Sequence, residues 1–148
     1  CLNNVYLFRW ECDFFFFFYS GYCIEVEIYI SRSDFKADFN KQLPNRCLKH
    51  DYLKDKTKTY KPNKFFFAFP SGLIKHDEIP NEYGIIELFD YGCKITRNAK
   101  FLHKENLFDK NNFLKSLLSK FYYRNIDLRN QLKLRDFDIK YKQEILFK

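Results

Sequence analysis

The segment Tyr22–Ile30 constrains the fold most, because its side chains alternate strictly between apolar and polar types. Branched aliphatic residues occupy one face, and Glu25 and Glu27 lie on the other. A period of two is the pattern of a β-strand with one buried face. The aromatic segment Glu11–Tyr19 is predicted as a second strand, with a turn at Gly21 between the two. The sequence therefore predicts an antiparallel β-hairpin.

The length of the hairpin loop decides which side chains face each other. A three-residue loop with a left-handed Gly21 places Asp13 opposite Glu27, and Glu25 opposite Phe15. A two-residue loop would shift the register and put Asp13 on the other face. In the three-residue register one face carries four acids, which are Glu11, Asp13, Glu25 and Glu27.

Four carboxylates on one face repel one another, and a divalent cation would relieve that repulsion. Mg²⁺ typically binds one or two carboxylates together with waters and phosphate oxygens. Asp13 and Glu27, with the backbone carbonyl of Ile28, form a candidate metal site. The alternative is a solvated face whose acids pair with lysine or arginine. The pattern alone leaves both interpretations open.

The rest of the chain predicts helices and further strands. Ser31 is a candidate helix N-cap, and Pro44 ends the helix that follows it. Strands are expected at 64–69, 84–90 and 93–96, and a helical pattern covers 109–134. The run Phe14–Phe18 predicts a strand buried on both faces. Strands mixed with helices indicate one α/β domain over residues 1–148, with its core at about 10–104 and a helical region at about 105–148.

Composition narrows the class of protein. The 148 residues suit a single domain, and 26 basic against 19 acidic residues give a net charge of +7. A basic chain favours nucleic acid, an anionic membrane surface or an acidic protein as partner. The longest apolar run, Phe14–Tyr19, is too short to span a bilayer, so no membrane insertion is expected. The five cysteines form no Cys-x-x-Cys pair, which favours reduced thiols in a cytoplasmic protein. The chain starts at Cys1 rather than methionine, so a truncated N-terminus is left open.

Two segments resemble a known family. The run Trp10–Asp13, followed by Ile24–Phe35, is similar to small phage and bacterial proteins of the PD-(D/E)XK nuclease-like superfamily, including those related to the DNA-repair protein MmcB. The pattern of that family is an Asp on one strand, Glu-x-Lys on the next strand, and a helix that opens with Ser-x-x-Asp-Phe. The likeness continues at Asp38, Lys41, Lys49, His50, Lys61–Phe67, Pro70–Ile74, Ile79-Pro80 and Tyr83–Ile86, and covers roughly residues 10–104.

The resemblance implies a restriction-endonuclease-like fold, in which helices flank a mixed β-sheet core. It also implies phosphodiester cleavage of nucleic acid that depends on Mg²⁺ or Mn²⁺, with DNA as the expected substrate and Asp13 and Glu27 as metal ligands. Tyr29 stands where the family has its catalytic lysine, and a phenol carries no positive charge at neutral pH. Lys36 or Lys41 could replace that charge. The alternative is a catalytically inactive nucleic-acid-binding or accessory protein on the same fold.

Other residues are expected around this site. Asp34 and Asp38 would border it in a supporting role, as would Glu11 and Glu25. The expected contacts to nucleic acid are Lys36, Lys41, His50, Lys54, Lys56 and Lys58. For these residues, a solvated helix face or a polar loop is the competing interpretation. A homodimer is compatible with the resemblance, and a phage structural or interaction module is a third function to test.

Overall fold

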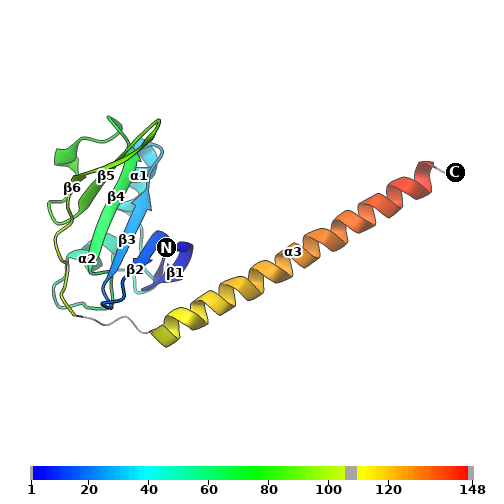
Figure 1. The fold of residues 1–148 in the computed structure, drawn as a ribbon, viewed down its shortest axis with the longest axis horizontal. Coiled ribbons are helices and arrows are strands. Elements are labelled where there is room, and N and C mark those ends of the chain that lie inside the picture. The colour runs from blue at the N-terminus through cyan, green and yellow to red at the C-terminus, as the bar shows by residue number, and fades with distance from the viewer. Residues whose placement is uncertain (1, 106–109, 147–148) are drawn as a thin grey trace. The chain divides into compact units, whose positions relative to one another are not determined.

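The computed structural model describes residues 2–105 and 110–146. The chain divides into two compact units, one of residues 1–109 and one of residues 110–148. The first unit holds all the strands and the short helices (Figure 1). The second is the long helix α3, Lys110–Leu146, which lies within the helical region predicted at about 105–148.

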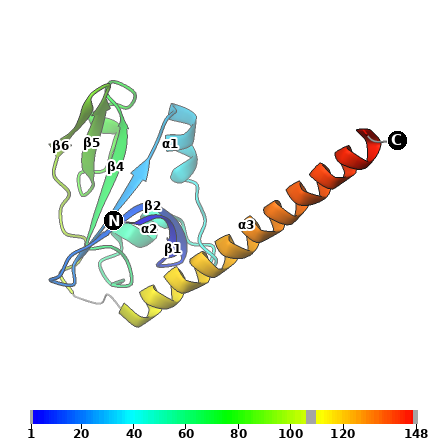
Figure 2. The same cartoon turned by 45° about the vertical axis from the view of Figure 1, so that its right-hand side comes forward.

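The first unit is built on a six-stranded mixed sheet whose strand order follows the sequence. The strands are β1 Leu2–Leu7, β2 Trp10–Phe17, β3 Cys23–Ile28, β4 Lys64–Pro70, β5 Gly84–Phe89 and β6 Gly92–Arg97. The central pairs β3–β4 and β4–β5 are parallel, and the outer pairs are antiparallel. Figure 2 shows the strong twist that a sheet of this kind acquires. The predicted mixed α/β architecture is confirmed at this level.

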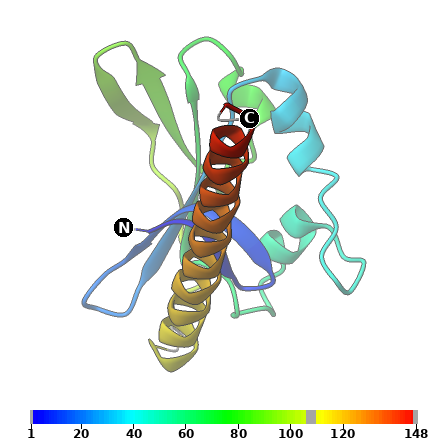
Figure 3. The same ribbon diagram turned by 90° about the vertical axis from the view of Figure 1, so that its right-hand side faces the viewer.

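The crossover from β3 to β4 carries two helices, α1 Arg32–Asp38 and α2 Lys49–Lys54. Ser31 caps α1 as predicted, and its hydroxyl accepts a hydrogen bond from the Asp34 N–H. α1 is shorter than expected, and α2 was not predicted because six residues give no helical period. Both helices pack on the same face of the sheet, since Phe35 of α1 and His50 of α2 both contact Phe67 of β4 (Figure 3). A 3-10 turn at His76–Glu78 lies between β4 and β5.

The β2–β3 hairpin has the predicted register. Glu25 pairs with Phe15, and Gly21 adopts a positive φ of 86°. The ladder ends at Phe14 and Val26, one step before the expected pair of Asp13 and Glu27.

The alternation along β2 changes phase near Asp13. Trp10 and Cys12 are buried, and the next buried residue is Phe15, three positions on. The Trp10 indole reaches Glu25, which is the cross-strand partner of Phe15. Trp10, Cys12 and Phe15 therefore face the helices together, whereas a strict period of two would separate them. Glu11 is exposed as a result. The prediction that Glu11 lies on the same face as Glu25 and Glu27 is therefore wrong.

The expectation that Phe14–Phe18 is buried on both faces is wrong. Only Phe15 is fully buried, while Phe16 is 38% and Phe18 is 47% exposed. The physical reason is that α1 and α2 both cover the same face of the sheet, so they do not bury the side chains on the other face. On the opposite face a smaller cluster forms around Phe66, with Val26, Ala68 and Ala99.

Among the described residues, no helix is long and apolar enough to cross a membrane. Cys12, Cys23, Cys47 and Cys93 are free thiols.

Candidate functional site

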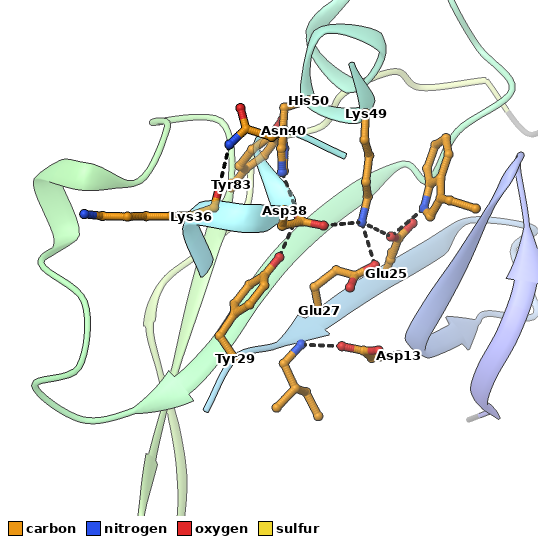
Figure 4. Close-up of polar contacts among 12 residues, drawn as sticks. Asp13, Glu25, Glu27, Tyr29, Lys36, Asp38, Asn40, Lys49, His50 and Tyr83 are labelled. Carbon is orange, nitrogen blue, oxygen red and sulfur yellow. Dashed lines mark hydrogen bonds and ion pairs between the residues drawn. The ribbon is translucent and has the colours of Figure 1, made fainter. Parts of the chain in front are cut away.

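A pocket of about 410 Å³ opens where β2 and β3 meet α1. Its lining residues are Asp13, Glu27, Ile28, Tyr29, Asp34, Ala37, Asp38 and Lys41. The three residues predicted as metal ligands therefore share one pocket with the predicted catalytic tyrosine and one predicted nucleic-acid contact. The lining residues come from β2, from β3 and the residue after it, and from α1 and the loop after it. Figure 4 shows Asp13, Glu27, Tyr29 and Asp38 among them.

Asp13 is held at the point where the β2–β3 ladder stops. Its Oδ2 accepts a hydrogen bond of 2.8 Å from the backbone N–H of Ile28. The carboxylate thus takes the place of a backbone partner at the end of β3. This bond fixes Asp13 beside the strand end that carries Glu27 and Ile28.

Lys49 is the main residue that the sequence-based site did not include. It lies in the first turn of α2, its side chain is fully buried, and its Nζ is 2.6 Å from Glu27 Oε1. The same Nζ is 3.3 Å from Glu25 Oε1 and 3.7 Å from Asp38 Oδ1. The spacing of residues along the sequence does not indicate that Lys49 belongs to the site, because Lys49 is 22 positions from Glu27. The available signal was charge balance, because two glutamates on a buried strand face require a buried cation.

Glu25 and Glu27 have different surroundings. Glu25 Oε1 also accepts a 2.7 Å hydrogen bond from the Trp10 indole, and its Oε2 has no hydrogen-bond partner among the described residues. Burial raises the pKa of Glu27 to about 9, although the ammonium of Lys49 opposes this rise. Repulsion from Glu25 adds to the increase. The pKa of Glu27 therefore lies well above its ordinary value, and a cation that binds Glu27 must compete with a proton.

A chain of hydrogen bonds runs behind the pocket from Tyr29 to Tyr83. The Tyr29 hydroxyl donates to Asp38 Oδ2 at 2.7 Å, and His50 Nε2 lies 2.7 Å from the same oxygen. His50 Nδ1 lies 3.1 Å from the Tyr83 hydroxyl. Hydrogen bonds from His50 and Tyr29, together with the charge of Lys49, lower the pKa of Asp38 despite burial. Burial in turn lowers the pKa of His50 and raises the pKa of Tyr29. Asp38 is thus a buried anion that orients its neighbours.

The structure separates the predicted nucleic-acid contacts into three groups. Lys41 lines the pocket. The exposed residues outside the pocket lining are Lys36, Lys54, Lys56 and Lys58. His50 is in the core, 2% exposed and stacked on Phe39 at 4.3 Å, so it reaches no surface where nucleic acid could touch it. Lys61, in the polar segment that follows α2, is also buried. Its ammonium caps the end of α2 by donating hydrogen bonds to the carbonyls of Leu53 and Asp55.

The residues present can be tested against the expected Mg²⁺. Within residues 2–105 and 110–146, no group of three or more His, Cys, Asp and Glu side chains is arranged to hold a metal ion. Mg²⁺ does not require such a group, since it binds through one or two carboxylates and retains waters. Asp13 and Glu27 line one open pocket, and this donor set fits a cation of that kind.

The comparisons with known proteins concern the fold. No family model and no curated protein matches the chain. Among solved structures, the chain is similar to the SPO1766 protein of unknown function from Silicibacter pomeroyi, with a TM-score of 0.54 and 20% sequence identity. The match covers 80% of this chain and 70% of that protein. At this identity the similarity shows a shared fold and carries no function.

Proposed function

We propose that the protein has a restriction-endonuclease-like fold and hydrolyses phosphodiester bonds in DNA with Mg²⁺ or Mn²⁺. The observation that carries this proposal is that Asp13 and Glu27, from adjacent strands, line one pocket, and that Glu27 pairs with the buried ammonium of Lys49. A bound Mg²⁺ would polarise the scissile phosphate and make hydroxide available near neutral pH. Asp13 and Glu27 would hold it, together with the Ile28 carbonyl.

Lys49 supplies the positive charge that the sequence lacks at Tyr29. Its ammonium lies 2.6 Å from Oε1 of Glu27, and Glu27 lines the pocket. In a buried setting a fixed charge stabilises developing negative charge far more than it does in water. Tyr29 instead positions Asp38, because its hydroxyl donates to that carboxylate. We therefore propose Lys49, rather than Lys36 or Lys41, as the replacement cation, which acts through its charge and not by contact with the phosphate.

A second candidate function is nucleic-acid binding without cleavage. It is favoured by the complete burial of Lys49, whose Nζ is surrounded by Glu25, Glu27 and Asp38. An ammonium paired in this way holds the acids in place but cannot touch a phosphate directly. The two candidates share the pocket and differ only in turnover.

A nicking assay on supercoiled plasmid DNA with Mg²⁺ or Mn²⁺ separates the two candidates. The first predicts metal-dependent nicking that falls by about 100-fold or more in Asp13→Asn, because a metal ligand is lost. Asp90→Asn, an exposed acid in the β5–β6 turn, is the matched control and keeps activity. Silence from the native chain with activity in Tyr29→Lys would support the binding-only candidate. Nicking that survives in Asp13→Asn would overturn the assigned site.

A further inference from the structure

A second groove lies near the metal pocket and is not explained by the proposed chemistry. It measures about 450 Å³ and is lined by Arg9, Trp10 and Glu11 on one side and by residues 41–44 on the other. Lys41 also lines the pocket, and the two hollows therefore share Lys41 as a lining residue.

Backbone hydrogen bonds fix the position of Lys41. Its N–H donates to the carbonyl of Asp38 at 3.0 Å, and its own carbonyl accepts from the Lys49 N–H at 2.9 Å. Both partners belong to the acid and lysine cluster behind the pocket. The position of Lys41 is thus tied to that cluster, although its side chain is partly exposed.

Arg9 is placed on the other wall by an unusual turn. It joins β1 to β2 with a φ of 114°, a value that residues other than glycine adopt only at a cost. Its guanidinium lies over the ring of Tyr52 at 5.7 Å. Tyr52 is buried and packs edge-on against Trp10 at 5.9 Å. The fold therefore retains a strained residue that brings a cation to this groove.

We propose that this groove is a binding subsite for the DNA backbone, in which Arg9 and Lys41 contact phosphates next to the one in the metal pocket. A guanidinium matches phosphate oxygens with its planar fork of donors, and a lysine adds a mobile point charge. Two cations and the single acid Glu11 line this groove, whereas four acids and one lysine are among the eight residues that line the metal pocket. A polyanion that enters the acidic pocket gains its attraction from this neighbouring groove. The choice of DNA as the polyanion rests on the proposed function, whereas the phosphate contact of Arg9 and Lys41 can be tested without cleavage.

The test measures binding by the full chain carrying Asp13→Asn, so that cleavage does not interfere. Fluorescence anisotropy with a labelled DNA oligonucleotide, single-stranded and as a duplex, is recorded over a range of salt concentrations. Arg9→Gln and Lys41→Gln are each expected to weaken binding about tenfold and to reduce the slope of log K against log salt by about one. Arg9→Lys should restore the slope because the charge is kept. Lys94→Gln, an exposed lysine on β6, is the control with the same loss of charge.

The outcomes separate this inference from the proposed function. If Arg9→Gln and Lys41→Gln bind as Lys94→Gln does, the subsite is wrong, whether or not the native chain cleaves. Absence of any DNA binding by the Asp13→Asn chain would also overturn it. Selective loss in the two groove variants from a protein that never nicks DNA would support the subsite and reject cleavage.

Discussion

At the scale of single residues, the arrangement of the site depends on how each buried charged side chain is paired with a partner. Glu27 contacts Lys49, and Asp38 receives hydrogen bonds from two neighbours. The pKa values of the two acids shift in opposite directions. Burial raises the pKa of Glu27, whereas the hydrogen-bond and charge partners of Asp38 lower the pKa of Asp38. A buried charge that lacks its partner is among the most destabilising features in a protein.

Glu27 should make the protein less stable as the solution becomes more alkaline. Its pKa rises from 4.5 to about 9 on folding, so its stabilising contribution is complete below 4.5 and is lost as pH rises toward 9. Glu27→Gln should therefore at least halve the fall in melting temperature between about pH 5 and about pH 8. Thermal unfolding in EDTA measures this change. An unchanged pH dependence in Glu27→Gln would show that Glu27 is ionised throughout that range.

Removing the cation of the cluster should cost far more than removing an acid. Lys49→Met leaves Glu25 and Glu27 buried without a counter-ion, and we expect a loss of about 3–5 kcal/mol in the free energy of unfolding. The double variant Lys49→Met/Glu27→Gln should recover part of that loss. Denaturant unfolding of the single and double variants checks the coupling. Additive effects would contradict the ion pair.

Gly84 tests packing at a single backbone position. A Cβ there would lie 2.2 Å from the ring of Phe66 and 2.8 Å from the backbone nitrogen of Ala99. Gly84→Ala should therefore lower the free energy of unfolding by about 1–3 kcal/mol. Phe66→Leu in the same chain should reduce this penalty, because a smaller side chain makes room. If Gly84→Ala lowered the free energy of unfolding equally with Phe and with Leu at position 66, the Phe66 ring would not be what limits the space beside Gly84.

At the scale of elements, connections are held by side chains that bond to backbone carbonyls. Arg97 of β6 donates to the carbonyls of His76, Ile79, Pro80 and Tyr83. Lys61 does the same for α2, and Asn63 donates to the carbonyls of His103 and Glu105. These contacts replace regular secondary structure in the long connections of the sheet.

Arg97→Lys tests whether the guanidinium fork itself is needed. A lysine keeps the charge but cannot reach four carbonyls, so we expect a loss of about 1–3 kcal/mol. The backbone amides of residues 76–83 should exchange faster with solvent deuterium. Arg46→Lys, at an exposed loop position, serves as the control. The same exchange protection in both variants would mean that charge alone holds the connection.

The sequence predicted the elements whose signal is local. The alternation in Tyr22–Ile30 predicted β3, Gly21 marked the turn, and Ser31 marked the start of α1, whereas the β2–β3 register also depended on the assumed three-residue loop. α2 could not be found this way, because its packing on β4 stabilises it rather than its own period. The role of Lys49 was missed for the same reason, since it depends on a contact over 22 positions. The phase change near Asp13 is likewise set by the Trp10–Glu25 contact across the hairpin.

At the scale of the whole molecule, the charge is divided unevenly between the two units. Ten of the 26 basic residues but only four of the 19 acidic ones lie in 110–148, so that unit carries +6 of the net charge of +7. The first unit, which contains the pocket lined by Asp13 and Glu27, is close to neutral. A neutral unit with an acidic pocket attracts a polyanion weakly at long range, whereas a basic helix attracts it strongly. Along α3, Lys115, Arg124 and Arg129 are exposed.

We therefore expect α3 to supply most of the salt-dependent affinity for nucleic acid. Replacing Lys115, Arg124 and Arg129 together by glutamine should lower the slope of log K against log salt by up to about three, since each lost phosphate contact contributes about one. The triple variant keeps every residue of the pocket and groove, so its cleavage at saturating DNA should match that of the native chain. Binding isotherms over a salt series provide the comparison, with Lys75→Gln/Lys94→Gln/Lys100→Gln as a matched loss of three exposed charges from the first unit. A larger loss of slope in this control than in the α3 variant would place the electrostatic attraction on the sheet unit instead.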